Sequence, residues 1–165
     1  MAEIEIALPE VYLQPGESYL AREPTIIRTI LGSCVGVAFW NERLGIGALC
    51  HAQLPRTPKI TRGGLTLAAG RRYVDFAIRD LAGQFDDLGV SRAETQIKLF
   101  GGGDVLLVSE HGDLKPTVGK LNCESALAVL LDMRYEVTAS SLGGHSGLNI
   151  RFNTSNGEVL LRRLH

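Results

Sequence analysis

The sequence predicts an α/β domain in which a largely antiparallel sheet system carries two long helices on one face. Short apolar segments separated by glycine-rich turns fill the first and last thirds of the chain, as in many-stranded proteins. Two longer segments in the middle repeat apolar residues every three or four positions, the period of amphipathic helices. Glycine contributes 19 of 165 residues, which suits a chain with many turns.

Length, net charge and cysteine content narrow the kinds of protein that the chain can be. A chain of 165 residues is long enough for one domain with a sizeable core, and we expect a single domain over residues 1–165. The net charge is −1 with no block of like charges, so nothing favours nucleic acid or an anionic membrane. No apolar run approaches the ~20 residues of a membrane span. Three cysteines without a Cys-x-x-Cys pair and an acidic N-terminus favour the cytoplasm.

The first third of the chain is expected to form strands. Alternating apolar residues predict strands at 4–8 and 23–30, with a turn at Pro15-Gly16-Glu17 between them. Residues 35–40 and 45–51 are predicted to form a hairpin around a turn at 41–44. The segment 56–64, rich in threonine, proline and glycine, is either a gate beside His51 or a plain surface connection.

Two helices and four more strands follow. The first helix is predicted over 67–88, with Gly89 as the glycine that follows its last turn. Its apolar stripe is Tyr73, Phe76, Ala77, Leu81, Phe85 and Leu88. A strand at 96–100 runs into Gly101-Gly102-Gly103. The second helix is expected to begin near Asn122, a good N-cap residue. Strands are predicted at 136–142, 148–153 and 158–164, and Asn156-Gly157 predicts a hairpin between the last two.

The candidate site comes from the predicted hairpin. A turn centred between Glu42 and Arg43 places Cys34 directly opposite His51, with Cβ atoms about 5 Å apart. An adjacent imidazolium lowers the pKa of a thiol and so makes it nucleophilic. Backbone N–H groups around Gly32, Ser33 and Cys34 are candidates to bind an oxyanion, and Thr29 is a candidate to orient the imidazole.

Other constellations carry weaker signals. Gly101-Gly102-Gly103 lacks the lysine and spacing of a phosphate loop, and is read as allowing close packing. Scattered cysteines and histidines give no metal-ligand spacing, and Cys50 and His51 point to opposite faces of a strand. Cys123, expected as the first residue of the second helix, has no neighbouring base and ranks below Cys34. His145, in a glycine-rich turn, is an outside candidate for a second site histidine.

The chain resembles the chemoreceptor glutamine deamidase family, CheD, over nearly its whole length. The resemblance rests on Leu-Gly-Ser-Cys-Val-Gly-Val from Leu31 and on His-Ala-Gln-Leu-Pro from His51. It continues in the blocks Tyr73-Val74-Asp75-Phe76-Ala77, Lys98-Leu99-Phe100-Gly101-Gly102, 119–122 and Leu142-Gly143-Gly144-His145-Ser146-Gly147, and in the closing hairpin.

This resemblance implies a three-layer α/β/β fold and a hydrolase that converts selected glutamines of methyl-accepting chemotaxis receptors to glutamate. It implies Cys34 as nucleophile, His51 as general base and acid, and Thr29 as the orienting residue, with no cofactor or metal. It also implies binding of a CheC-type phosphatase. The family often has one more residue between threonine and cysteine, which leaves Thr25 as an alternative to Thr29, and Leu148 stands where the family commonly has arginine.

Three functional hypotheses stay open at the sequence level. The first is the protein-glutamine deamidase. The second is a binding module that docks a chemotaxis phosphatase or receptor with little catalysis. The third keeps the cysteine chemistry but transfers the acyl group in peptide hydrolysis or transglutamination, because all of these reactions share an acyl-enzyme.

Overall fold

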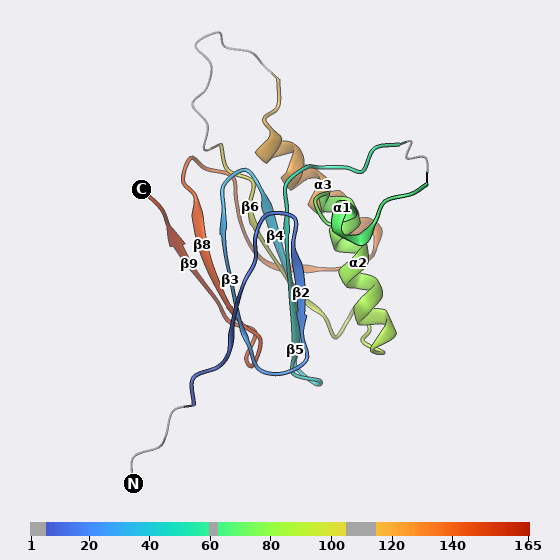
Figure 1. Ribbon diagram of the computed structural model, residues 1–165, viewed down its shortest axis with the longest axis vertical. Helices are drawn as coiled ribbons and strands as arrows, with labels where there is room; N and C mark the ends of the chain where they lie inside the picture. The colour runs from blue at the N-terminus through green and yellow to red at the C-terminus, as the bar shows by residue number, and fades with distance from the viewer. Residues whose placement is uncertain (1–5, 60–62, 105–114) are drawn as a thin grey trace.

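The computed structural model describes residues 6–59, 63–104 and 115–165, and these form three layers (Figure 1). The strands are β1 (Glu10–Tyr12), β2 (Ser18–Ala21), β3 (Ile26–Leu31), β4 (Val35–Asn41), β5 (Ile46–Ala52), β6 (Gln96–Gly101), β7 (Val137–Leu142), β8 (Leu148–Asn153) and β9 (Val159–Arg163). The helices are α1 (Leu67–Gly70), α2 (Val74–Asp87) and α3 (Val118–Asp132).

Two sheets and a helical layer confirm the predicted fold class. One sheet has the strand order β1-β3-β8-β9, and the other has the order β2-β5-β4-β6-β7. The pairs β1–β3 and β6–β7 are parallel, whereas β3–β8, β8–β9, β2–β5, β4–β5 and β4–β6 are antiparallel. The five-stranded sheet lies in the middle, with α2 and α3 on one face and the four-stranded sheet on the other (Figure 1).

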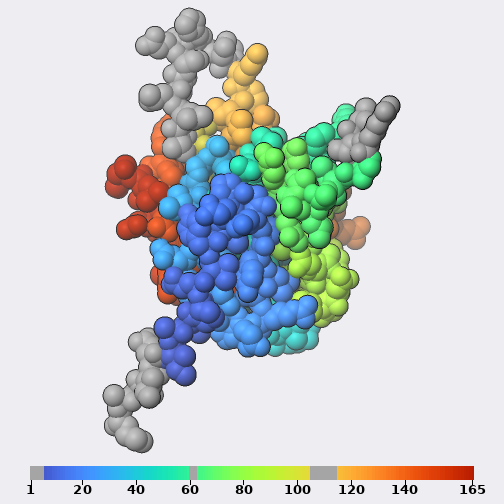
Figure 2. Space-filling model, viewed as in Figure 1, coloured from blue at the N-terminus to red at the C-terminus, as the bar shows by residue number. Residues whose placement is uncertain are grey.

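The middle layer explains the most apolar part of the sequence. Every residue of β4 and β5 is buried, because each face of these strands is covered by another layer. On the helical side Phe39 packs against Phe85 and Tyr135, with ring centroids 5.4 Å apart in both pairs. Between the sheets the core includes Leu31 and Phe152. In Figure 2 the N-terminal segment faces the viewer between the C-terminal strands and α2.

The single helix predicted over 67–88 is wrong, because the chain breaks into α1 and α2. Residues 71–73 instead meet the end of β5 in a bridge between Leu54 and Tyr73. The N–H groups of Gln53 and Leu54 donate to the carbonyl oxygen of Arg72 at 2.8 and 3.1 Å, and the N–H of Val74 donates to Leu54 at 2.8 Å. Tertiary pairing therefore interrupts a segment whose apolar period continues across the break.

The predicted start of the second helix is also wrong. α3 begins one turn earlier, where the hydroxyl of Thr117 accepts the N–H of Lys120 at 3.2 Å. Asn122 consequently lies inside the helix and is fully buried. Cys123 consequently lies in the second turn of α3, so its predicted place as the first residue of the helix is wrong.

The remaining strands follow the predictions unevenly. Of the strand predicted at 4–8, residues 4 and 5 lie outside the described residues and 6–8 are not in a strand, while β1 and β2 were not predicted. β6, β7, β8 and β9 lie where they were expected, and the β8–β9 hairpin is confirmed. Part of the 56–64 loop, residues 60–62, lies outside the described residues. Within the described ranges, no helix is long and apolar enough to cross a membrane.

Candidate active site

The β4–β5 hairpin carries the two residues that the sequence singled out. The structure pairs Gly36 with His51, so the predicted direct opposition of Cys34 and His51 is wrong by two positions. The turn spans residues 42–45, one position later than expected, and the side-chain oxygen of Asn41 accepts the N–H of Leu44 at 2.9 Å. A shift of two residues preserves the face of every side chain. Cys34 lies just before β4 and packs against the core cluster between the two sheets, the side toward which His51 also points.

His51 reaches across the space between the sheets to Thr29 on β3. The Thr29 hydroxyl lies 2.7 Å from Nδ1 of His51 and 2.9 Å from the carbonyl oxygen of Leu13. A carbonyl only accepts, so the single hydroxyl proton goes to Leu13 and the hydroxyl oxygen accepts from Nδ1–H. The neutral imidazole consequently keeps its lone pair on Nε2. Sequence reasoning missed Leu13, because a backbone carbonyl leaves no signal in the residue type.

Burial sets the protonation of the pair. His51 is only 2% exposed, and removal from water lowers its pKa to about 4, well below the ordinary 6.5. Cys34 is half-buried, and burial raises the pKa of its thiol. This differs from the expectation that an imidazolium lowers the thiol pKa. At neutral pH the resting pair is a thiol and a neutral imidazole, an arrangement suited to general-base activation.

The loop 32–34 between β3 and β4 is held by the glycine run after β6. The N–H of Gly103 donates to the carbonyl oxygen of Gly32 at 2.9 Å, and the N–H of Gly102 donates to that of Cys34 at 2.8 Å. Gly101 has φ +99°, and a Cβ there would lie 2.2 Å from the Cys34 oxygen, so only glycine permits this approach. Among the described residues, no hydrogen-bond acceptor is found for the N–H groups of Gly32 and Ser33.

Among the described residues, none of the other candidates forms a hydrogen bond with Cys34 or His51 through its side chain. The Thr25 hydroxyl donates to the carbonyl oxygen of Glu23 at 2.8 Å, so it is Thr29 that contacts His51. Cys50 points into the helical side of the core, and burial raises its pKa to about 12. Cys123 has its thiol pKa raised by burial, and His145 is exposed.

Within the described part of the chain, no group of three or more histidine, cysteine or acidic side chains is placed to hold a metal ion.

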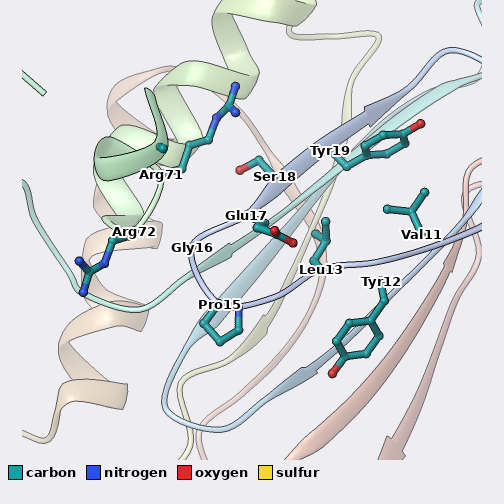
Figure 3. Close-up of a pocket in the computed structure, with 11 residues that line it drawn as sticks. Val11, Tyr12, Leu13, Pro15, Gly16, Glu17, Ser18, Tyr19, Arg71 and Arg72 are labelled. Atoms are coloured by element: carbon teal, nitrogen blue, oxygen red, sulfur yellow. The ribbon is translucent and has the colours of Figure 1, made fainter. Parts of the chain in front are cut away.

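A cavity of about 510 Å³ lies between the segment from Val11 to Tyr19 and the α1 region, which contributes Arg71 and Arg72 (Figure 3). Its lining includes Tyr19, Arg71 and Arg72, and Cys34 is not part of it. The cavity borders Gly16 and Glu17, which pair with the backbone of His51. The N–H of Gly16 donates to the carbonyl oxygen of His51 at 2.7 Å, and the N–H of His51 donates to the carbonyl oxygen of Glu17 at 2.9 Å. The thiol therefore lies outside this cavity, half-buried at the end of the sandwich where loop 32–34 meets the glycine run.

Comparisons with known proteins point in one direction. The family model described as CheD chemotactic sensory transduction matches residues 54–163. "Probable chemoreceptor glutamine deamidase CheD 2" of Geobacter sulfurreducens is 39% identical over 158 residues, covering 96% of this chain and 92% of that protein. "Probable chemoreceptor glutamine deamidase CheD" of Maridesulfovibrio salexigens is 33% identical over 99% of this chain and 97% of its own. The protein of that name from Pseudomonas savastanoi pv. phaseolicola is 35% identical, covering 95% and 86%.

Proposed function

Since this chain belongs to the CheD family, we propose that it is a chemoreceptor glutamine deamidase that works through Cys34, His51 and Thr29. The substrate is the side-chain carboxamide of selected glutamines in a methyl-accepting chemotaxis receptor, and the products are glutamate and ammonia. Relatives that bear the deamidase name align with nearly all of the chain, including the segment before residue 54 that contains these three residues.

The hydrogen bond between Thr29 and Nδ1 of His51 carries the proposal. The Thr29 hydroxyl donates its proton to the carbonyl oxygen of Leu13, so its oxygen accepts the Nδ1–H of His51. This holds the imidazole in the tautomer whose Nε2 is a free base. His51 lies on the same sheet face as Cys34, so that base serves the thiol. A residue that fixes ring orientation and tautomer is the third component of nucleophile–histidine systems.

The chemistry proceeds in two steps. Nε2 of His51 removes the thiol proton as Sγ of Cys34 bonds to the carboxamide carbon, and the same proton passes to the nitrogen, which leaves as ammonia. The resulting thioester is then attacked by water, which gives a proton to Nε2. The C–S bond breaks, the receptor keeps a glutamate, and the proton returns to the Cys34 sulfur.

The loop geometry supports stabilisation of the tetrahedral intermediates. With the carbonyls of Gly32 and Cys34 engaged by Gly103 and Gly102, the N–H groups of Gly32 and Ser33 are the donors we assign to the oxyanion. The half-buried position of Cys34 suits a glutamine on a protein surface, since a small free substrate is usually enclosed in a pocket. Docking of a CheC-type phosphatase stays a prediction of the family resemblance.

Intact mass spectrometry of a receptor cytoplasmic fragment tests this function. The fragment is incubated with the protein, with a Cys34→Ala variant and with a Cys123→Ala control, in water enriched in heavy oxygen. We expect conversion of glutamine to glutamate, about 1 Da per site before isotopic label, with wild type and the control only. Heavy oxygen enters the new carboxylate, which distinguishes hydrolysis from transfer to an amine. Unchanged fragment with wild type, or equal activity of Cys34→Ala, would refute the assignment.

A further inference from the structure

Loop 32–34 is held at a third carbonyl by a side chain from α3. Nδ2 of Asn122 lies 2.9 Å from the carbonyl oxygen of Ser33. Three consecutive carbonyl oxygens of the loop, those of Gly32, Ser33 and Cys34, thus all accept a hydrogen bond. Consecutive peptide groups whose oxygens are all engaged have little freedom to rotate, so the direction of their N–H groups is fixed with them.

The same nitrogen also holds the segment that follows His51. Nδ2 of Asn122 lies 3.0 Å from the carbonyl oxygen of Gln53, two residues after His51. One amide group therefore joins the residue before Cys34 to the end of the strand that carries His51. Both segments are far from α3 in the sequence. The first turns of α3 begin at the end of the sheets where these segments lie (Figure 1).

Packing alone does not explain an asparagine at position 122. The residue is fully buried, and its Oδ1 has no hydrogen-bond partner among the described residues. A buried amide with an unused acceptor destabilises a fold compared with an apolar side chain of similar size. Three further inward positions of α3, Ala126, Val129 and Leu130, are apolar. The two donors of the amide are what distinguishes Asn122 from them.

We propose that Asn122 is a positioning residue that fixes the nucleophile loop relative to His51 by binding the carbonyls of Ser33 and Gln53. This inference rests on the proposed function for its catalytic consequence, and on the hydrogen bonds alone for its structural one. The side chain does not contact the substrate. It acts on the reaction by holding the Cys34 thiol near Nε2 of His51 and the loop N–H groups toward the carboxamide oxygen.

Ser125 provides a matched control one turn further along α3. It is also buried, and its hydroxyl donates to the carbonyl oxygen of Pro55, beyond the segment that carries His51. Replacing either residue by alanine removes a buried donor between α3 and the β5 end. Only Asn122→Ala releases the carbonyl next to Cys34. A difference between the two variants therefore reports positioning of the loop, and a common effect reports helix packing.

The experiment compares wild type, Asn122→Ala and Ser125→Ala at a temperature where all are folded. For ammonia release we expect Asn122→Ala to lower kcat about 10- to 100-fold with KM changed less than about threefold, and Ser125→Ala to change kcat less than about twofold. In parallel, iodoacetamide modification of Cys34 is followed by peptide mapping across pH. A released loop exposes the thiol, so Asn122→Ala should be alkylated several-fold faster, with its profile moved to lower pH.

Equal kcat values for the two variants, or a Cys34 alkylation profile in Asn122→Ala that matches wild type, would overturn the inference. If Asn122→Ala does not fold, Asn122→Ser, which keeps one donor, is measured against Ser125→Ala by the same criteria. The alkylation measurement needs no substrate. If wild type releases no ammonia, the proposed function fails, and the alkylation profiles still decide whether Asn122 fixes the loop.

Discussion

Acid should destabilise this protein through His51, and the effect is large enough to measure. The pKa of the buried imidazole is about 4 in the fold and about 6.5 in the unfolded chain. Between these values the unfolded state binds more protons than the folded state, so the free energy of unfolding falls as the pH is lowered. The stabilising contribution is complete above the unfolded pKa and is lost as the pH falls toward the folded pKa.

The size of the effect follows from the two pKa values. At about 1.4 kcal/mol per pKa unit, lowering the pH from 7 to 4 removes about 3 kcal/mol from the free energy of unfolding. This is a substantial part of the ~5–15 kcal/mol that stabilises a typical domain.

Urea unfolding followed by the fluorescence of Trp40 measures the loss. Trp40 is the single tryptophan and is 8% exposed, so it reports the folded core. His51→Asn keeps a donor for Thr29 but does not titrate, and His145→Asn removes an exposed histidine as a control. Wild type and His145→Asn should lose about 3 kcal/mol more than His51→Asn between pH 7 and pH 4. Parallel pH dependence of all three proteins would refute the assigned protonation of His51.

Three further predictions concern catalysis and packing. The acid limb of kcat/KM for ammonia release should fall near pH 4, because the proposed base is His51 and burial lowers its pKa; a midpoint near 6.5 would contradict this. Thr29→Val should reduce kcat at least about 10-fold and lower the free energy of unfolding by about 1–3 kcal/mol, whereas Thr29→Ser keeps the hydroxyl and should retain activity. Equal activity of the two variants would remove Thr29 from the proposed mechanism. Gly102→Ala should lower the free energy of unfolding in urea by roughly 2–4 kcal/mol, because a Cβ there would lie 2.0 Å from Sγ of Cys123. Gly83→Ala, which has open space around it in α2, should raise the free energy of unfolding by about 0.5–1 kcal/mol. Equal effects of the two substitutions would contradict the packing argument.

The hairpin shows how far local patterning reaches. Alternating apolar residues predicted β4 and β5 to within one residue, but the turn was placed one residue too early, which shifts the pairing register by two residues. The error left Cys34 and His51 on one face, because side-chain direction in a strand repeats every two residues. A turn that holds its shape with the side chain of Asn41 gives no signal strong enough to fix the register.

The helices show where tertiary structure overrides periodicity. The apolar stripe across 67–88 continues through residues 71–73, and only the backbone pairing of Arg72 with Gln53 and Leu54 breaks the helix there. Asn122 was interpreted as an N-cap because asparagine favours that position. In the fold its amide binds carbonyls of Ser33 and Gln53 instead, partners that no local pattern specifies.

The sequence by itself determined the fold class, most strand positions, the cysteine and histidine of the candidate site, and the family resemblance, because these depend on residue type, short-range period and ordered motifs. Only the tertiary structure decided that Thr29 rather than Thr25 meets His51, that Nε2 carries the free lone pair, and that burial keeps both Cys34 and His51 neutral at pH 7. Each of these depends on contacts between separate sheets and on exclusion of water, and both arise only when the three layers pack together.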